Sequence, residues 1–144
     1  MDLSDAWWFW ALLSAVFAAL TAIFAKVGVA GIDSDVATFI RTVVILVTLG
    51  LILLALGKFH SPGGVSTRTW IFLVLSGLAT GASWICYFRA LKVGDAALVA
   101  PVDKLSVVLV AIFGVTLLGE RLSGLQWAGV GLVGVGAVLL VVSG

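Results

Sequence analysis

Residues 100–123 read APVDKLSVVLVAIFGVTLLGERLS, and this stretch decides how the rest of the chain is interpreted. It is long and apolar enough to cross a bilayer, which needs about 20 mostly apolar residues. It nevertheless begins with Pro101, Asp103 and Lys104 close together. A charge at the centre of a membrane span costs about 2.5–3.5 kcal/mol on insertion scales, and such residues commonly have a function. The stretch therefore predicts a membrane span whose charged end belongs to a working site.

The composition of the whole chain supports a membrane location. Of its 144 residues, 62% are hydrophobic and only 10% are charged; a soluble domain is typically about 45–50% apolar and about 25% charged. The net charge of +1 gives no electrostatic basis for binding nucleic acid. The chain has one cysteine, Cys86, and one histidine, His60, and they form no metal-ligating pattern. The sequence also contains no nucleophile triad and no phosphate-binding loop. We therefore expect a multi-pass protein of the plasma membrane (cell inner membrane) that is not an enzyme and uses no cofactor or metal.

Five segments qualify as spans, and the linkers between them are short, so we expect one all-α integral membrane domain over residues 1–144. The predicted spans are Ala6–Ala25, Val36–Leu56, Trp70–Phe88, Ala96–Leu118 and Leu125–Val142. The alternative, a soluble helical bundle, requires a polar face on each helix. These segments are apolar almost all round, and their few polar residues form narrow stripes of the kind that packs helices together in lipid.

Local signals place the ends and irregularities of these helices. Asp95 is positioned to cap the fourth predicted helix, and Ser123 and Gln126 have the spacing of a capping box before the fifth. Pro101 lacks a backbone N–H, so it frees the carbonyl of Ala97 and kinks the fourth span. Because irregular backbone at membrane depth is tolerated where it is buried in protein or lines a wet cavity, the kink strengthens the case for a site here.

The basic residues of the loops are divided evenly between the two sides of the membrane. The N-terminal side has Lys58, Arg68 and Arg121, and the opposite side has Lys26, Arg89 and Lys92. A protein with one fixed orientation normally shows an excess on its cytoplasmic side. The even division predicts insertion in both orientations. The alternative is that Arg41 tips the balance and makes the side opposite the N-terminus cytoplasmic.

Four stretches carry a resemblance to a known family. They are AVFAALTAIFAKVGV (residues 15–29), DVATFIRTVVI (35–45), GLATGASWICYFRALKVGDAALVAPVDKLSVV (77–108) and LLGERLSGLQWAGVGLVGVGAVLL (117–140). The chain resembles a single-domain, five-span member of the EamA family in the drug/metabolite transporter superfamily, most specifically at Ala100-Pro101 and at the turn that contains Gly119-Glu120-Arg121. The resemblance implies that small metabolites or drugs cross the membrane by alternating access, and it implies no particular substrate.

The resemblance also implies a partner, because most members of the family hold two such halves in one chain. Many transporters are two halves of inverted topology around a site at the membrane midplane, and no repeat is evident within this chain. We therefore expect half of an inverted-repeat transporter, which a second copy completes as an antiparallel homodimer. Gly129 and Gly136 share a face of the fifth span, which resembles the dimerisation helix of small multidrug-resistance transporters. The alternative for both glycines is packing within the monomer.

Charged residues within the spans define a candidate site for substrate binding or gating. At 1.5 Å per residue, Arg41 lies about 8 Å into the second span, and Asp103 and Lys104 lie about 12 Å into the fourth from the same side. Adjacent helix residues point about 100° apart, so we expect Asp103 to pair with Arg41 and Lys104 to face the cavity. A sum of +1 suits an anionic or zwitterionic ligand. The alternative is a structural network of charges, with Arg41 reaching toward the interface.

Trp84 and Tyr87 share a face of the third span and form a candidate aromatic wall for this site, although aromatics in a bundle more often simply pack. Together with the resemblance, the charges favour a small-molecule transporter. Two other functions stay open: a non-transporting partner subunit of another membrane protein, and a flippase for lipid-linked sugars, which some relatives in the superfamily move. A subunit that only packs does not need charges within its spans, so the charged residues discriminate between the first two.

Overall fold

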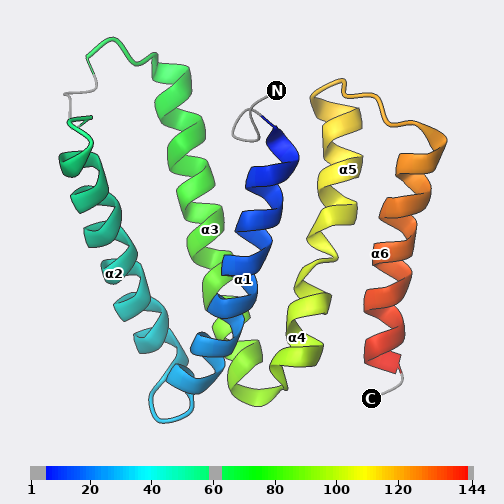
Figure 1. Ribbon diagram of the computed structural model, residues 1–144, viewed down its shortest axis with the longest axis horizontal. Helices are drawn as coiled ribbons and strands as arrows, with labels where there is room; N and C mark the ends of the chain where they lie inside the picture. The colour runs from blue at the N-terminus through cyan, green and yellow to red at the C-terminus, as the bar shows by residue number, and fades with distance from the viewer. Residues whose placement is uncertain (1–5, 59–62, 143–144) are drawn as a thin grey trace. The chain divides into compact units, whose positions relative to one another are not determined.

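The computed structural model describes residues 6–58 and 63–142. This part of the chain contains α-helices and no strand (Figure 1). The helices are α1 (Trp7–Val29), α2 (Ser34–Ala55), α3 (Thr67–Val93), α4 (Ala96–Asp103), α5 (Ser106–Leu117) and α6 (Gly124–Val142). His60, which we do not expect to bind a metal, lies outside the described residues.

Five helical segments are long and apolar enough to cross a membrane, because α4 and α5 together make one span, Ala96–Leu117. The prediction of an all-helical, multi-pass membrane protein is confirmed. α1 and α3 continue past their predicted ends, to Val29 and Val93. The charges of Lys26 and Arg89 end the apolar segments but not the helices, because long basic side chains extend along a helix while keeping their charged ends in polar surroundings.

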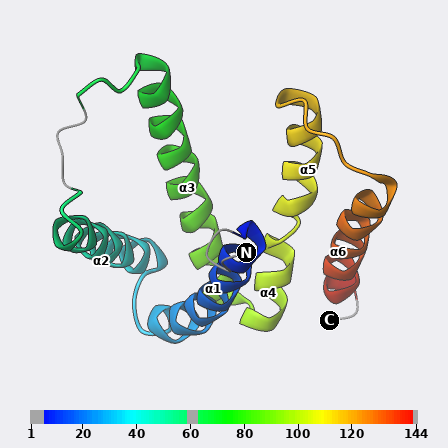
Figure 2. The same ribbon diagram turned by 45° about the horizontal axis from the view of Figure 1, so that its top comes forward.

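The chain forms two compact units. In the unit Phe24–Val93, α2 and α3 pack against each other and lie closest where α2 begins and α3 ends (Figure 1). The other unit combines Met1–Ile23 with Gly94–Gly144, and in it both α4 and α5 pack against α6. Figure 2 shows α5 beside α6 from a second direction, with the short unwound connection between α4 and α5.

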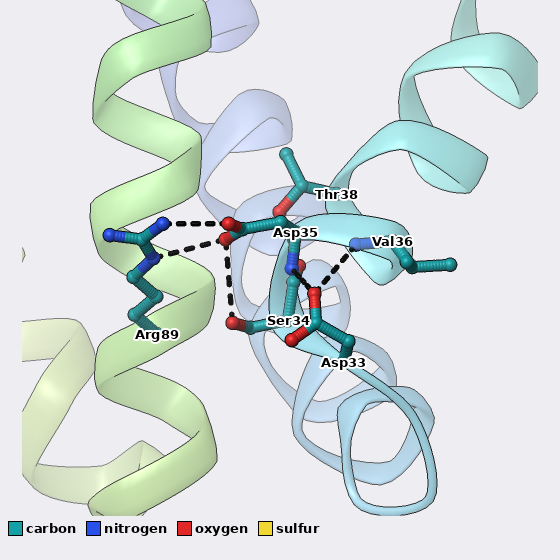
Figure 3. Close-up of polar contacts among 6 residues, drawn as sticks. All are labelled: Asp33, Ser34, Asp35, Val36, Thr38 and Arg89. Carbon is teal, nitrogen blue, oxygen red and sulfur yellow. Dashed lines mark hydrogen bonds and ion pairs between the residues drawn. The ribbon is translucent and has the colours of Figure 1, made fainter.

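Both ends of α2 are fixed by caps. The carboxylate of Asp33 accepts hydrogen bonds from the backbone N–H groups of Asp35 at 2.8 Å and Val36 at 3.2 Å, which satisfies donors that the first turn leaves free (Figure 3). At the other end Gly57 adopts a φ of 62°, in the left-handed region that glycine enters without a steric penalty. The N–H of Lys58 then bonds back into the last turn at 2.9 Å, as in a Schellman motif.

The predicted capping box before α6 is confirmed. The backbone N–H of Ser123 donates to Gln126 Oε1 at 2.7 Å, and the N–H of Gln126 donates to Ser123 Oγ at 3.3 Å. Asp95 occupies the N-cap position of α4, but its side chain makes no capping hydrogen bond. Its backbone carbonyl accepts instead from the N–H groups of Leu98 and Val99 at 3.0 and 2.9 Å.

The fourth span is broken rather than only kinked. Pro101 lies within α4, and the helix ends at Asp103. The N–H of Lys104 donates to Pro101 O at 3.1 Å, and the N–H of Val107 donates to Lys104 O at 2.9 Å. These bonds span three residues instead of four, so the backbone tightens to 3₁₀ geometry before α5 begins. The irregularity that Pro101 predicts therefore occurs, but it lies C-terminal to the proline, at Asp103 and Lys104.

Few side chains are buried within the protein. Leu91 is 0% exposed and Val29 is 1% exposed, and both lie in the unit Phe24–Val93, near the ends of α3 and α1. Most large apolar side chains lie on the outside, including Val93 and Leu125. Soluble monomers rarely expose apolar patches of more than a few hundred Å². The outward surface therefore suits contact with lipid tails, and the folded state depends on the bilayer.

Candidate functional site

Arg41 lies against two aromatic rings of the neighbouring helix. Its guanidinium carbon is 4.0 Å from the ring centroid of Trp84 and 5.6 Å from that of Phe88, both on α3. Trp84 and Phe88 are four residues apart, so they share one helix face. A cation over an aromatic face contributes roughly 0.5–2 kcal/mol, with the larger value where water is excluded. This contact therefore helps to hold α2 against α3.

Within its own unit, Phe24–Val93, the side chain of Arg41 has no acidic partner among the described residues. Arg89 pairs with Asp35 and Lys104 pairs with Asp103, and Arg41 belongs to neither pair. Arg41 and Asp103 lie in different units, so the predicted ion pair between them stays a prediction.

Asp103 and Lys104 pair with each other, which corrects the expectation that adjacent residues on this helix do not meet. Lys104 Nζ lies 3.1 Å from Asp103 Oδ2. The expectation assumed a continuous helix and ignored the length of the lysine side chain. In the structure Lys104 is the C-cap of α4, at the break before α5. The two opposite charges at the break therefore compensate each other locally.

The predicted aromatic wall is built differently from the expectation. Trp84 is half-buried and contacts Arg41, whereas Tyr87 is half-buried and has the ring of Phe88 as a neighbour, with centroids 6.5 Å apart. Phe88 is 3% exposed and completes the surroundings of Arg41, and sequence reasoning missed it. Its spacing of four residues from Trp84 was the available signal, but a phenylalanine within an apolar span is not distinctive.

A second polar cluster, also missed, joins the beginning of α2 to the end of α3. Arg89 donates from Nε to Asp35 Oδ1 at 3.0 Å and from a terminal nitrogen to Asp35 Oδ2 at 2.6 Å (Figure 3). Two parallel bonds of this kind give both strength and a defined orientation. The residues are 54 positions apart, and the available signal was that both fall at predicted span ends on the same side of the membrane.

Two lysines strengthen the same end of this unit by binding backbone carbonyls. Lys26 Nζ donates to Leu91 O at 2.8 Å, and Lys92 Nζ donates to Ile32 O at 2.8 Å. The carbonyls in the last turn of a helix have no intrahelical partner, so a lysine near Leu91 satisfies one of them. The contacts connect the end of α1 and the following loop to the end of α3, and we interpret them as structural.

The glycines of α6 divide into two groups. A Cβ on Gly134 would lie 3.2 Å from Val108 Cγ2, so Gly134 allows α5 to approach α6 closely. A Cβ on Gly129 or Gly136 would meet no atom within 4 Å in the described structure. The monomer therefore uses Gly134 for its own packing, and the face that carries Gly129 and Gly136 is open.

An open groove of about 580 Å³ lies between α5 and α6. Its lining is apolar and includes Leu105, Val108, Leu109, Gly131, Gly134, Val135, Val138 and Leu139. Sites for polar solutes combine apolar walls with a few converging polar groups. This groove has no such groups, so it is not a candidate site for a polar solute.

Comparison with known proteins now gives the family. Residues 5–142 match the model of the EamA-like transporter family. The chain is 64% identical over 140 residues to a protein of Sinorhizobium sp. described as "Uncharacterized transporter in cobO 3′ region", and the match covers 97% of this chain and 99% of that protein. No solved structure matches the chain. The match over nearly all residues confirms the resemblance inferred from the sequence, and the chain belongs to the EamA-like transporter family.

Proposed function

We propose that this protein moves a small polar solute across the membrane by alternating access, as an antiparallel homodimer in the plasma membrane. The family and the Sinorhizobium relative support the transporter class. That relative matches over almost its whole length, so a protein of one five-span domain is itself described as a transporter.

The need for a second copy follows from the architecture of such transporters. Alternating access commonly uses two halves of opposite topology that move against each other around a midplane site. Five candidate spans supply one half. The even division of loop lysines and arginines allows the same chain to insert in both orientations, and the open face of α6 at Gly129 and Gly136 provides a surface for close helix contact.

The observation that carries the proposal is Arg41, a cation within the span Ser34–Ala55 that has no acid partner among the described residues of its own unit. A charge within a span is costly and usually marks a solute or ion pathway. The other proposed substrate-binding or gating residues lie in two spans. They are Trp84, which contacts Arg41, and Tyr87, both on α3, and Asp103 and Lys104 at the broken span near Pro101.

Flux in liposomes that contain only this purified chain tests the proposal. We expect time-dependent uptake of at least one solute from a panel of acidic, basic, zwitterionic and neutral metabolites, above the level of empty liposomes. A matched sample of heat-unfolded protein controls for leakage. Absence of uptake for the whole panel, with the protein shown to be folded, would contradict the proposal and favour a non-transporting partner subunit.

A further inference from the structure

The way Arg41 is held leaves its hydrogen-bonding edge available. A guanidinium is planar, and its five N–H donors lie in that plane, whereas its attraction to an aromatic ring acts through its face. The ring centroid of Trp84 lies 4.0 Å from the guanidinium carbon and that of Phe88 lies 5.6 Å away, so α3 provides aromatic rings beside the group. An aromatic ring accepts no conventional hydrogen bond, so these contacts leave the N–H donors available for an anion.

Arg89 provides an internal comparison within the same unit. Two of its donors bind the carboxylate of Asp35, at 3.0 and 2.6 Å. Among the described residues of this unit, 24–58 and 63–93, no carboxylate or carbonyl accepts a hydrogen bond from the side chain of Arg41. The same pair of helices therefore holds one arginine that already has its oxyanion and one that does not.

The hydroxyl groups nearest in sequence do not take the place of an anion. Thr38 Oγ1 donates to Ser34 O at 2.8 Å, and Thr42 Oγ1 donates to Thr38 O at 2.8 Å. Both hydroxyl protons are therefore used within α2, and the hydroxyls carry no charge that would balance Arg41. A bare cation among apolar helices is strongly disfavoured unless it is paired.

The remaining charges within the spans also point to Arg41. Asp103 and Lys104 compensate each other at 3.1 Å, and Asp35 and Arg89 do the same. The other cations of the spans, Lys26, Arg68 and Lys92, lie in the first or last turn of their helices. Arg41 is therefore the uncompensated charge that lies deeper within a span. A planar fork matches the two oxygens of a carboxylate or phosphate group.

We propose that Arg41, beside Trp84 and Phe88, is an oxyanion site and that the transported solute is an organic anion bearing a carboxylate or phosphate. This inference rests on the proposed transport function. The same chemistry is present in lipid headgroups: Arg41 is seven residues into α2, about 10 Å along its axis, and a long side chain reaches the interface from such a depth. The experiment therefore needs arms that separate a soluble anion from a lipid phosphate.

Ligand binding is measured first, by thermal unfolding of the purified chain in a neutral detergent at constant ionic strength. The probes are matched pairs: succinate against succinamide, and glycerol 3-phosphate against glycerol. Short-chain phosphatidic acid serves as the lipid arm. The variants are Arg41→Gln and Arg41→Lys, and the control is Arg68→Gln, which removes the same charge from another arginine that lies over an aromatic ring, 5.8 Å from Phe72.

We expect at least one soluble anion, but not its neutral counterpart, to stabilise the protein. Arg41→Gln should abolish this stabilisation, Arg41→Lys should weaken the affinity at least tenfold because the planar fork is lost, and Arg68→Gln should retain it. The inference is overturned if no soluble anion stabilises the protein, or if Arg41→Gln responds like the unaltered chain. Stabilisation by phosphatidic acid alone would assign Arg41 to a lipid headgroup and overturn the solute assignment.

Flux of the same probes separates this inference from the proposed function. Uptake of anions that Arg41→Gln reduces at least tenfold supports both. Uptake confined to neutral or basic solutes, and unchanged in Arg41→Gln, overturns the oxyanion site while transport stands. Anion binding that depends on Arg41, without any flux, supports the oxyanion site and overturns the proposed transport.

Discussion

The carboxylate of Glu120 lies over the backbone of Gly114, where a Cβ would be only 2.5 Å from Glu120 Oε2 and 3.3 Å from its Cδ. The turn between them explains this position. Gly119 adopts a φ of 71°, and the carbonyl of Gly114 accepts from the N–H groups of both Leu118 and Glu120, at 3.2 and 3.0 Å. The Gly-Glu pair that marks the family resemblance therefore ends α5 by folding back over its last turn.

This turn predicts different costs for two glycine substitutions. Gly119→Ala places a side chain in the left-handed region, which costs roughly 1–2 kcal/mol, and we expect a clear loss of thermal stability in detergent. Gly114→Ala meets only the end of the flexible Glu120 side chain, which can swing away, so we expect a smaller loss.

Gly77→Ala is the control for that comparison, because a Cβ there meets nothing within 4 Å and its backbone is helical. We expect it to leave the unfolding temperature unchanged or to raise it slightly. Equal destabilisation by Gly119→Ala and Gly77→Ala would show that the left-handed turn contributes nothing to stability.

The ion pair between Arg89 and Asp35 predicts coupled effects of substitution. The side chains are 61% and 48% exposed, so the pair acts at the surface of its unit. We expect Arg89→Gln and Asp35→Asn each to lower the unfolding temperature, and the double variant to lower it by less than the sum. Additive losses would contradict an interaction between the two residues. High salt should reduce the coupling, because it screens exposed charges.

The pair at the break between α4 and α5 predicts loss of flux without loss of fold. We expect Asp103→Asn and Lys104→Ala each to abolish flux in liposomes, because each leaves an uncompensated charge or an empty position at the proposed site. Size-exclusion chromatography checks that the variants keep the size of the unaltered protein. Flux equal to that of the unaltered protein in either variant would remove that residue from the site.

A variant in which the two residues are exchanged, Asp103→Lys with Lys104→Asp, separates two requirements. Flux needs either mutual neutralisation of the two charges or a particular charge at a particular position. If local neutralisation is the whole requirement, the exchanged pair should recover flux that the single substitutions lose. If it stays inactive while folded, at least one of the two charges has to occupy its native position.

The fold was predictable because spans, caps and breaks are encoded locally. About 20 apolar residues define a span whatever its neighbours are, and the capping box of Ser123 and Gln126 occupies a few successive residues. The depth of Arg41 followed from the same local pattern. Its contact with Trp84 and Phe88 was not predictable, since it depends on which helices are neighbours and how they are rotated.

The expectation for Asp103 and Lys104 failed for a related reason. It treated the fourth span as one regular helix, whereas the backbone tightens and stops at these residues. Pro101 predicted an irregularity but not its position, because the helix continues through the proline and ends at Asp103. Side-chain geometry at a break cannot be derived from helical spacing.

The glycines of α6 allow the orientation of the proposed dimer to be tested directly. Gly129 and Gly136 lie at nearly equal distances from the two ends of α6 (Gly124–Val142). Two antiparallel copies of the helix that cross at its centre therefore bring Gly129 of one copy opposite Gly136 of the other. Two parallel copies instead bring each glycine opposite its own equivalent. Close approach of helices at small residues makes either contact suitable for a disulfide.

Cysteine cross-linking in membranes distinguishes these arrangements, in a background where the exposed Cys86 is replaced by serine. We expect Gly129→Cys and Gly136→Cys chains, carrying different tags and expressed together, to form a mixed disulfide dimer far more readily than either forms alone. Gly131→Cys is the matched control, because its position is equally uncrowded but lines the groove between α5 and α6, on another side of the helix from Gly129 and Gly136. Efficient disulfides within each single variant, with little mixed product, would indicate parallel chains, and an inverted pair of halves could not then be built from this contact.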